Sequence, residues 1–100
     1  MIARIWHGKT KAAIADDYRD FLRARAVADY QAIAGNLGTH ILHRREGDEA
    51  HFITFTFWEN VEAIKAFAGE DFEKTKYYPE DKNYLLEFEP NVAHYEVVGK

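Results

Sequence analysis

The chain has 100 residues with a formal net charge of −4, and 47% of them are apolar. This length predicts one domain over residues 1–100, and the excess of acidic over basic residues argues against a nucleic-acid partner. The chain has no cysteine, which excludes disulfides and thiolate chemistry, and no segment approaches the roughly 20 apolar residues that a membrane span needs. We therefore expect a cytoplasmic protein with no membrane segment and no signal peptide.

The first third of the chain predicts a strand followed by a long helix. Residues 2–7 favour a strand that Gly8 ends. Thr10 is then expected to cap the helix, which Gly35 and Asn36 should end. The apolar positions of this helix recur with helical spacing on one face, at Ile14, Tyr18, Phe21 and Leu22.

The middle of the chain predicts a hairpin and a second helix. Residues 37–46 and the segment up to Trp58 favour two strands joined by a two-residue turn at Gly47 and Asp48. Asn60 is expected to cap the second helix, and Gly69 to end it.

The end of the chain predicts less regular structure. Residues 71–78 favour a further helical turn ended by Pro79, residues 80–90 favour an irregular segment, and residues 92–98 favour a last strand. The order strand, helix, strand, strand, helix, strand is that of the ferredoxin-like split βαβ fold, an α+β class with an antiparallel sheet. Within that sheet we expect the strands at residues 2–7 and 49–58 to be central neighbours running parallel.

The turn at Gly47 and Asp48 fixes which residues of the hairpin share a face, because it places Glu46 opposite Glu49. One face then contains the pairs Leu42–Ile53, His40–Phe55 and Gly38–Phe57. The other contains His43–Phe52, Ile41–Thr54, Thr39–Thr56 and Leu37–Trp58.

Only one face of the sheet can lie under the helices, and neither face is polar enough to lie in water. We predict that the face with Phe55 and Phe57 is uncovered and packs against a second copy of the chain. From the first strand, Arg4 and Trp6 are expected on this aromatic face, and Ala3, Ile5 and His7 on the other.

The covered face is predicted to leave space for a ligand. The side chains of Thr39, Thr54 and Thr56 fill less volume than Phe or Leu, which indicates a cavity between sheet and helices. Trp58 and His7 are expected to border this cavity, if both lie at the same end of neighbouring strands. The alternative is that the helices fill the space completely.

Four short segments carry a resemblance to a known family: FWEN at 57–60, VEAIKAF at 61–67, YYPED at 77–81 and HYEV at 94–97. With the order of elements, they make the whole chain resemble the antibiotic biosynthesis monooxygenase-like family of dimeric α+β barrel proteins. The resemblance implies a homodimer whose two sheets close a barrel, with a pocket in each subunit. It also implies oxidation of phenolic substrates by molecular oxygen without metal or flavin, as some members perform.

Other members of that family degrade heme, with an asparagine on the first strand, a tryptophan at the end of the third and a histidine after the second helix. Trp58 matches the tryptophan, whereas His7 stands at or near the asparagine position and Lys76 near the histidine position. These two departures argue against heme degradation.

The resemblance and the residue types together suggest roles for the site. His7 is a candidate general base or orienting group, Tyr77 and Tyr78 are candidate hydrogen-bond partners of a phenolic oxygen, and Trp58 is a candidate pocket wall. Each has a structural alternative: a strand-end histidine, two loop-packing tyrosines and a core tryptophan.

We expect no cofactor. The histidines show no metal-ligand spacing, since His40 and His43 point to opposite faces of a strand, and the chain has no glycine-rich phosphate loop. The first hypothesis is a cofactor-independent monooxygenase-like protein that binds a small aromatic or polyketide-like molecule. The second is a non-catalytic dimeric binding or stress-associated module, and the third is a heme-binding protein. The sequence does not decide whether the protein is an enzyme.

Overall fold

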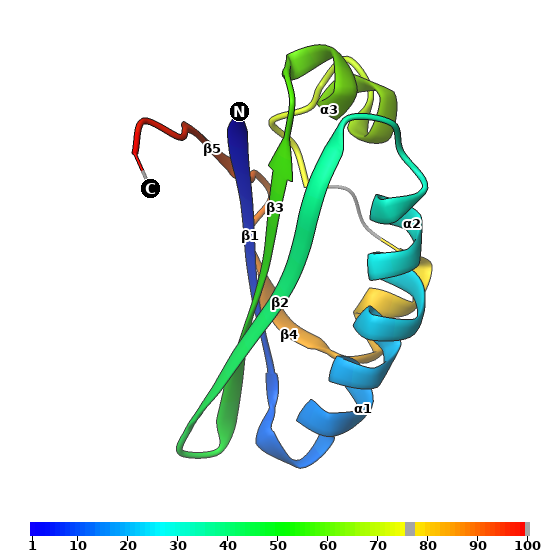
Figure 1. Ribbon diagram of the computed structural model, residues 1–100. Helices are drawn as coiled ribbons and strands as arrows, with labels where there is room; N and C mark the ends of the chain where they lie inside the picture. The colour runs from blue at the N-terminus through cyan, green and yellow to red at the C-terminus, as the bar shows by residue number, and fades with distance from the viewer. Residues whose placement is uncertain (76–77, 100) are drawn as a thin grey trace.

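The computed structural model describes residues 1–75 and 78–99 (Figure 1). The strands are β1 (Ile2–Lys11), β2 (Asn36–Glu46), β3 (Glu49–Trp58), β4 (Leu85–Phe88) and β5 (Ala93–Glu96). The helices are α1 (Ala15–Phe21), α2 (Val27–Gln31) and α3 (Val61–Ala68), with 3₁₀ turns η1 (Ala12–Ile14) and η3 (Pro79–Asn83) and a π-helical segment η2 (Leu22–Ala26). Among the described residues, no helix is long and apolar enough to cross a membrane.

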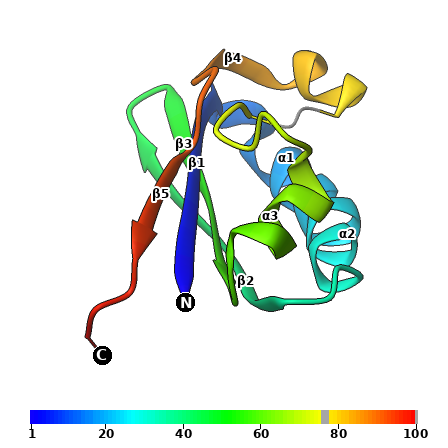
Figure 2. The ribbon, with the colours of Figure 1, turned by 90° about the horizontal axis from the view of Figure 1, so that it is seen from above.

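The molecule has two layers, a sheet and a set of helices that cover one of its faces. Figure 2 shows α1, α2 and α3 all on the same side of the strands. The strand order is β2-β3-β1-β4, and β5 also pairs with β1. All these pairings are antiparallel. The α+β class, the ferredoxin-like arrangement and the antiparallel sheet are therefore as predicted.

The last strand of the predicted fold is divided into two pieces. β4 pairs with the second half of β1, at residues 8–10, and β5 pairs with the first half, at residues 2–5. The predicted irregular segment at residues 80–90 thus contains both a 3₁₀ turn and a strand. The predicted helical turn at residues 71–78 is wrong where the structure describes it: Lys74 forms an isolated bridge with Asn91 instead.

The expected parallel pairing of β1 with β3 is wrong. The helical crossover makes β2 run in the direction of β1, and the hairpin then reverses β3, so β1 and β3 must be antiparallel. Ile2 consequently lies opposite Trp58, and His7 lies opposite Ile53. His7 and Trp58 therefore lie far apart along the strands, not at one end of them.

The same pairing corrects the predicted faces of β1. Arg4 lies opposite Thr56 and Trp6 opposite Thr54, so both residues belong to the covered threonine face. Ile5 and His7 belong to the aromatic face. The register of β1 with β3 sets these faces, and the prediction placed it wrong by one residue.

The first strand and the first helix also have different limits from those predicted. β1 continues through Gly8 to Lys11, and Thr10 is a fully buried strand residue, not a helix cap. The helical segment then runs from Ala12 to Gln31 with one π-helical stretch. Gly35 ends it as expected, with a φ of 91° that favours glycine, and a Cβ at Gly35 would lie 2.5 Å from the Cβ of Ala63.

The hairpin register matches the prediction over nearly its whole length, from the Glu46–Glu49 pair to the Gly38–Phe57 pair. The exception is its open end. A register shift between Asn36 and Gly38 places Asn36, not Leu37, opposite Trp58. Leu37 is therefore left out of the pairing and 52% exposed. A β-bulge of this kind is typical of an edge strand.

The second helix begins and ends as predicted. The Asn60 side chain accepts a hydrogen bond of 3.0 Å from the Ala63 backbone N–H, which caps the first turn of α3. Gly69 follows the helix with a φ of 88°.

The two faces of β3 alternate strictly in burial. Phe52, Thr54, Thr56 and Trp58 are buried beneath the helices, whereas Phe55 and Phe57 lie on the other face and are half-buried. The prediction that the aromatic face is uncovered is confirmed for the single chain. The covered face holds two clusters, one with Trp6, Tyr18 and Phe52 and the other with Trp58, Ile64 and Phe67.

Candidate functional site

A small cavity lies between the sheet and the helices, beside Thr54 and Thr56. The cavity and its opening to solvent together contain about 420 Å³ of space free of protein atoms. The centre of a water molecule fits into only about 20 Å³ of this space. A single water needs roughly 10–15 Å³ by this measure. The cavity predicted from the threonines is therefore present, and in this state it has room for water only. Its lining comprises Arg4, Trp6, Tyr18, Leu22, Ala26, Tyr30, Thr54, Thr56, Thr75, Tyr78, Asp81 and Val92.

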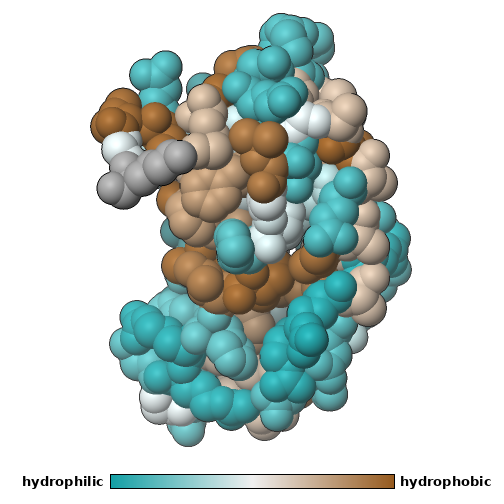
Figure 3. Space-filling model, viewed as in Figure 1, coloured by the Kyte–Doolittle hydropathy of each residue, from teal (hydrophilic) through white to brown (hydrophobic). Residues whose placement is uncertain are grey.

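Aromatic side chains form part of the cavity wall, at Trp6, Tyr18, Tyr30 and Tyr78. Tyr18 packs edge-on against Phe52 at 5.0 Å and lies 5.2 Å from Tyr84, measured between ring centroids. The Trp6 ring lies across Gly8, where an added Cβ would be 2.6 Å from the Trp6 Cη2 atom. The absence of a side chain at Gly8 thus allows the indole to occupy this position. Figure 3 shows the same molecule from its edge, with apolar residues in a band across the middle and hydrophilic residues above and below.

One end of the cavity is acidic. Asp81 is only 6% exposed, and its carboxylate accepts a hydrogen bond of 3.1 Å from the Tyr18 hydroxyl and one of 2.9 Å from the Tyr78 backbone N–H. Burial raises the pKa of Asp81, against the opposing effect of these hydrogen bonds. Burial also raises the pKa of Tyr18, and the nearby Asp81 charge raises it further. A buried carboxyl group with a raised pKa is a typical proton acceptor.

Tyr78, a predicted site residue, lines the cavity, but its hydroxyl is already engaged. It donates a hydrogen bond of 2.7 Å to the carboxylate of Asp29 in α2, and the Arg25 guanidinium lies 4.8 Å from its ring centre. Burial, with the Asp29 hydrogen bond, raises the pKa of Tyr78. Tyr78 therefore holds η3 against α2 in this state. Tyr77 lies outside the described residues.

The other end of the cavity is basic. Arg4 is 3% exposed, and its guanidinium donates to the backbone carbonyl of Phe72 and, over 3.5 Å, to that of Lys74. Its Nη1 atom also lies 3.2 Å from Nε2 of His94, which is opposite it on β5. Burial lowers the pKa of Arg4. Burial also raises the pKa of Tyr30 to about 12, although Arg4 opposes that change.

The structure separates the four predicted substrate-binding residues. Thr54 and Thr56 line the cavity, at 4% and 1% exposure. Trp58 is fully buried in the second cluster and lines no part of the cavity. Its Nε1 donates a hydrogen bond of 2.8 Å to the Thr56 hydroxyl. Trp58 therefore orients Thr56, which lines the cavity, without lining the cavity itself. Thr39 is half-buried on β2 outside the cavity lining, where its hydroxyl donates to Asn36 over 3.3 Å.

His7, the predicted general base, lies on the uncovered face of the sheet and does not reach the cavity. Its Nε2 is 3.0 Å from Nδ1 of His51, its Nδ1 is 3.3 Å from Glu89, and the other nitrogen of His51 is 3.3 Å from Glu46. The antiparallel pairing of β1 with β3 explains this difference. Among residues 1–75 and 78–99, no group of three potential ligands could hold a metal ion.

Sequence reasoning missed the charged groups of the cavity. Arg4 and Trp6 are two residues apart on β1, and the correct antiparallel pairing would have placed them opposite Thr56 and Thr54. Asp81 is the third residue of the helical turn that begins at Pro79. At this position a carboxylate commonly accepts a hydrogen bond from the backbone N–H of the residue that precedes the turn, here Tyr78. This signal was available in the YYPED segment.

Comparisons with solved structures identify the fold. The heme-degrader MhuD of Mycobacterium tuberculosis, solved with two hemes in its active site, is 22% identical, with 100% of this chain and 98% of that chain covered and a TM-score of 0.67. A candidate antibiotic biosynthesis monooxygenase from Bacillus cereus is 12% identical, with coverages of 99% and 94% and the same TM-score. PA3566 from Pseudomonas aeruginosa is 17% identical, with coverages of 98% and 94% and a TM-score of 0.69.

The fold is that of the antibiotic biosynthesis monooxygenase-like proteins. This confirms the resemblance seen in the sequence at the level of the fold, over the whole length of the chain. No protein-family model matches the sequence, and no curated protein matches it. The likeness is therefore one of architecture, and the chemistry of the site has to be argued from its own residues.

Proposed function

We propose that the protein is a cofactor-independent monooxygenase-like protein that binds a small aromatic or polyketide-like molecule in the cavity between sheet and helices. The observation that carries this proposal is a cavity with aromatic walls and buried polar groups, in a fold shared with proteins of this kind. Trp6, Tyr18 and Tyr30 supply flat surfaces for an aromatic ring, and Thr54 and Thr56 leave space beside it.

The buried carboxyl group provides the chemistry that such a protein needs. In an oxygenation of this class, a CH₂ carbon beside a phenol or enol takes one oxygen atom of O₂ and becomes a carbonyl. Its two hydrogens leave with the other oxygen atom as water, so no outside reductant is required. The protein has to bind, orient and deprotonate the substrate, and Asp81 is the group we assign as the proton acceptor. This assignment replaces His7.

A ligand has to displace part of the cavity wall, because the free space holds only water in this state. The walls differ in how firmly they are held. Thr54 and Thr56 belong to a central strand, whereas Tyr78 and Asp81 belong to the short turn η3 and its approach. We propose that η3 gives way when the ligand enters.

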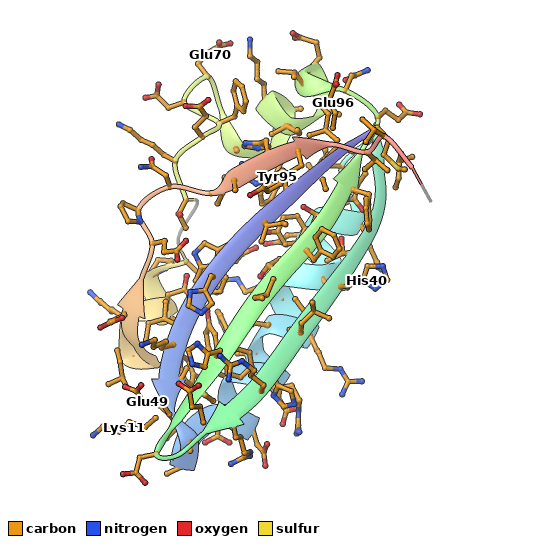
Figure 4. The ribbon with its side chains drawn as sticks, turned by 90° about the vertical axis from the view of Figure 1, so that its left-hand side faces the viewer. Lys11, His40, Glu49, Glu70, Tyr95 and Glu96 are labelled. Carbon is orange, nitrogen blue, oxygen red and sulfur yellow. The ribbon has the colours of Figure 1, made fainter. Side chains whose placement is uncertain are left out.

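The proposed assembly is a homodimer formed through the uncovered sheet face. Figure 4 shows this face with the strands in front and the helices behind them. It presents Phe55 and Phe57, whose ring centroids lie 4.8 Å apart with the rings tilted by 54°, together with the exposed Leu42 and Tyr95. Apolar groups of this size on an open face favour a second copy of the chain as partner.

Anthrone tests the activity, since its CH₂ lies between two aromatic rings that conjugate it to a ketone, which makes the CH₂ acidic and gives a phenolic enol. We expect the protein to quench or shift its tryptophan fluorescence on addition of anthrone, and to consume oxygen in an electrode cell. Asp81→Asn should lower oxygen uptake by about 10²–10⁴-fold with binding retained. Thr54→Leu should abolish binding by filling the cavity, whereas Ala28→Leu, which adds a leucine on the exposed side of α2, should not.

The non-catalytic binding module is the second candidate, and the small free space favours it. It predicts a filled interior with no accessible pocket, and therefore neither a fluorescence change with anthrone nor oxygen uptake above the rate in buffer. Absence of both signals would refute the aromatic-binding proposal itself. The heme-binding hypothesis has no such support, because neither His7 nor Trp58 faces the cavity.

A further inference from the structure

Arg4 is a buried cation without an anionic partner. It is 3% exposed on the covered face of β1, and no aspartate or glutamate in the described part of the chain forms an ion pair with it. Buried charges are normally paired, because removing an ion from water is costly. The cost is visible as the lowered pKa of Arg4, whose main cause is burial.

The groups that do contact the guanidinium are all neutral. Nη1 donates to the Phe72 carbonyl and to Nε2 of His94, and Nη2 makes only the long contact of 3.5 Å with the Lys74 carbonyl. His94 has to be neutral to accept this bond, in agreement with the lowering of its pKa by burial and by Arg4. Among the described residues, the Nε–H group has no acceptor. The Nε and Nη2 edge is one that binds a carboxylate with two parallel hydrogen bonds.

Trp6 provides a second unsatisfied donor in the same cavity. Its indole Nε1 is buried without a hydrogen-bond partner, and the residue as a whole is 7% exposed. Buried donors are rarely left without an acceptor. Trp6 stands two residues from Arg4 on the same face of β1, a separation of about 7 Å along the strand. Both residues line the cavity, so one cavity contains a cation without an anionic partner and a neutral donor without an acceptor.

The acidic end of the cavity does not supply this acceptor. Asp81 is held by its own donors, the Tyr18 hydroxyl and the Tyr78 backbone N–H. Among the described residues, no hydrogen bond or ion pair joins Arg4 to Asp81, so the cavity contains a buried cation and a buried carboxyl group that contact different partners.

We propose that the ligand of this cavity is a small aromatic acid, whose carboxylate binds between Arg4 and the Nε1–H of Trp6. This deepens the proposed function and rests on it, since it takes the same cavity as the ligand site. The carboxylate supplies the missing negative charge, and it places the ring between the aromatic walls with its far end toward Asp81. Neutral aromatic compounds of equal size do not supply this charge and bind more weakly.

A different role for Arg4 would be to tie the segment at Phe72 and Lys74 to the sheet. That role requires only the hydrogen bonds to the two carbonyls, and it predicts no ligand preference. A binding experiment with a charged and a neutral ligand of the same shape therefore distinguishes the ligand-binding role of Arg4 from its structural role.

The probes are benzoate and benzamide, which differ in charge and hardly in shape, measured by titration calorimetry at pH 7. We expect wild type to bind benzoate at least about tenfold more tightly than benzamide, as a charged hydrogen-bonded pair implies. Arg4→Met should remove this preference, with a far greater loss of affinity for benzoate than for benzamide. Arg4→Lys should keep part of the preference, and Arg23→Met, which removes an exposed arginine of η2, should keep all of it. The Trp6 indole N–H proton should shift with benzoate in NMR spectra.

Each alternative outcome identifies what has failed. Equal affinity of wild type for the two probes would overturn the carboxylate inference and leave the aromatic site in place. A benzoate preference that survives in Arg4→Met would also overturn it. Failure of both probes to bind to wild type would refute the aromatic site and hence the proposed function. Should Arg4→Met not fold, wild type and Arg4→Lys with the two probes decide the same question.

Discussion

The two faces of the sheet differ in the size and burial of their central side chains. The covered face has small hydroxyl side chains at its centre, where Thr54 and Thr56 are 4% and 1% exposed. The uncovered face has the large rings of Phe55 and Phe57, which remain half-buried within one chain. A monomeric protein would be expected to show the reverse, with rings beneath the helices and threonines toward water. The difference points to a ligand site on the first face and to a partner on the second.

The charged groups of the two faces differ in the same way. On the covered face Arg4 and Asp81 are buried and separate, and each is held by neutral donors or acceptors. On the uncovered face, His7 and His51 form a hydrogen-bonded row with Glu46 and Glu89 near solvent. Compensated charges near water contribute little to stability or binding, whereas uncompensated buried ones are commonly functional.

The largest effect is expected for a charge placed on the uncovered face. Phe55→Asp should raise the dimer dissociation constant at least about 100-fold, because the interface would bury a carboxylate without a partner. Sedimentation velocity over a range of concentrations measures this change. Ala66→Asp, which places the same charge on the exposed side of α3, should leave the assembly unchanged. A folded dimer of Phe55→Asp would mean that the interface lies elsewhere.

A second prediction compares one substitution on the two faces of the same strand. Phe52→Ala should lower the free energy of unfolding by about 3–5 kcal/mol at any protein concentration, because Phe52 is fully buried within the chain. The loss from Phe57→Ala should instead grow with protein concentration, since only the proposed dimer would bury that ring fully. Urea unfolding at low and high micromolar concentrations measures both. If the Phe57→Ala loss did not depend on concentration, the ring would have no role in assembly.

The sequence predicted the hairpin well because local rules determine it. The turn at Gly47 and Asp48 sets the register, and strict alternation then assigns every residue of β3 to a face. The site was predicted only in part, because it depends on how distant strands pair. Thr54 and Thr56 were found from β3 alone, whereas Arg4 and Trp6 required the pairing register of β1 with β3. A register wrong by one residue moved His7 into the site and Arg4 out of it.

The last strand shows a different limit. Residues 85–88 and 93–96 form two short strands that share the edge of β1, and neither has a long alternating pattern. What holds them is pairing with β1 and the contacts of η3, including the buried Asp81, and such contacts leave little trace in local sequence. The bulge at Leu37 was likewise not predictable from local sequence, because it depends on how the edge strand β2 pairs with β3.

The smallest predicted effect is the pH dependence of the free energy of unfolding, which has opposite signs for a carboxyl group on each of the two faces. Burial raises the pKa of Asp81 above its ordinary value in unfolded chains, which is about 3.9. The stability that this shift contributes is fully present below that value and is lost as pH rises through the folded-state pKa. Glu46 on the uncovered face behaves in the reverse manner, because the hydrogen bond from Arg44 and that from His51 lower its pKa. Its contribution is present above its ordinary pKa and is lost as pH falls.

Substitution separates the two contributions. At pH 3.5, Asp81→Asn should cost about 0.5–1.5 kcal/mol, the value of one buried hydrogen bond, because the amide replaces one acceptor by a donor. By pH 7 this cost should shrink, since wild type then carries an ionised buried carboxylate and the variant does not. Glu46→Gln should show the opposite trend, with its loss greater at pH 7 than at pH 3.5. Chemical denaturation at the two pH values measures these differences. An Asp81→Asn loss that increased toward pH 7 would show that the ionised carboxylate stabilises the fold, which is incompatible with its assignment as a proton acceptor of raised pKa.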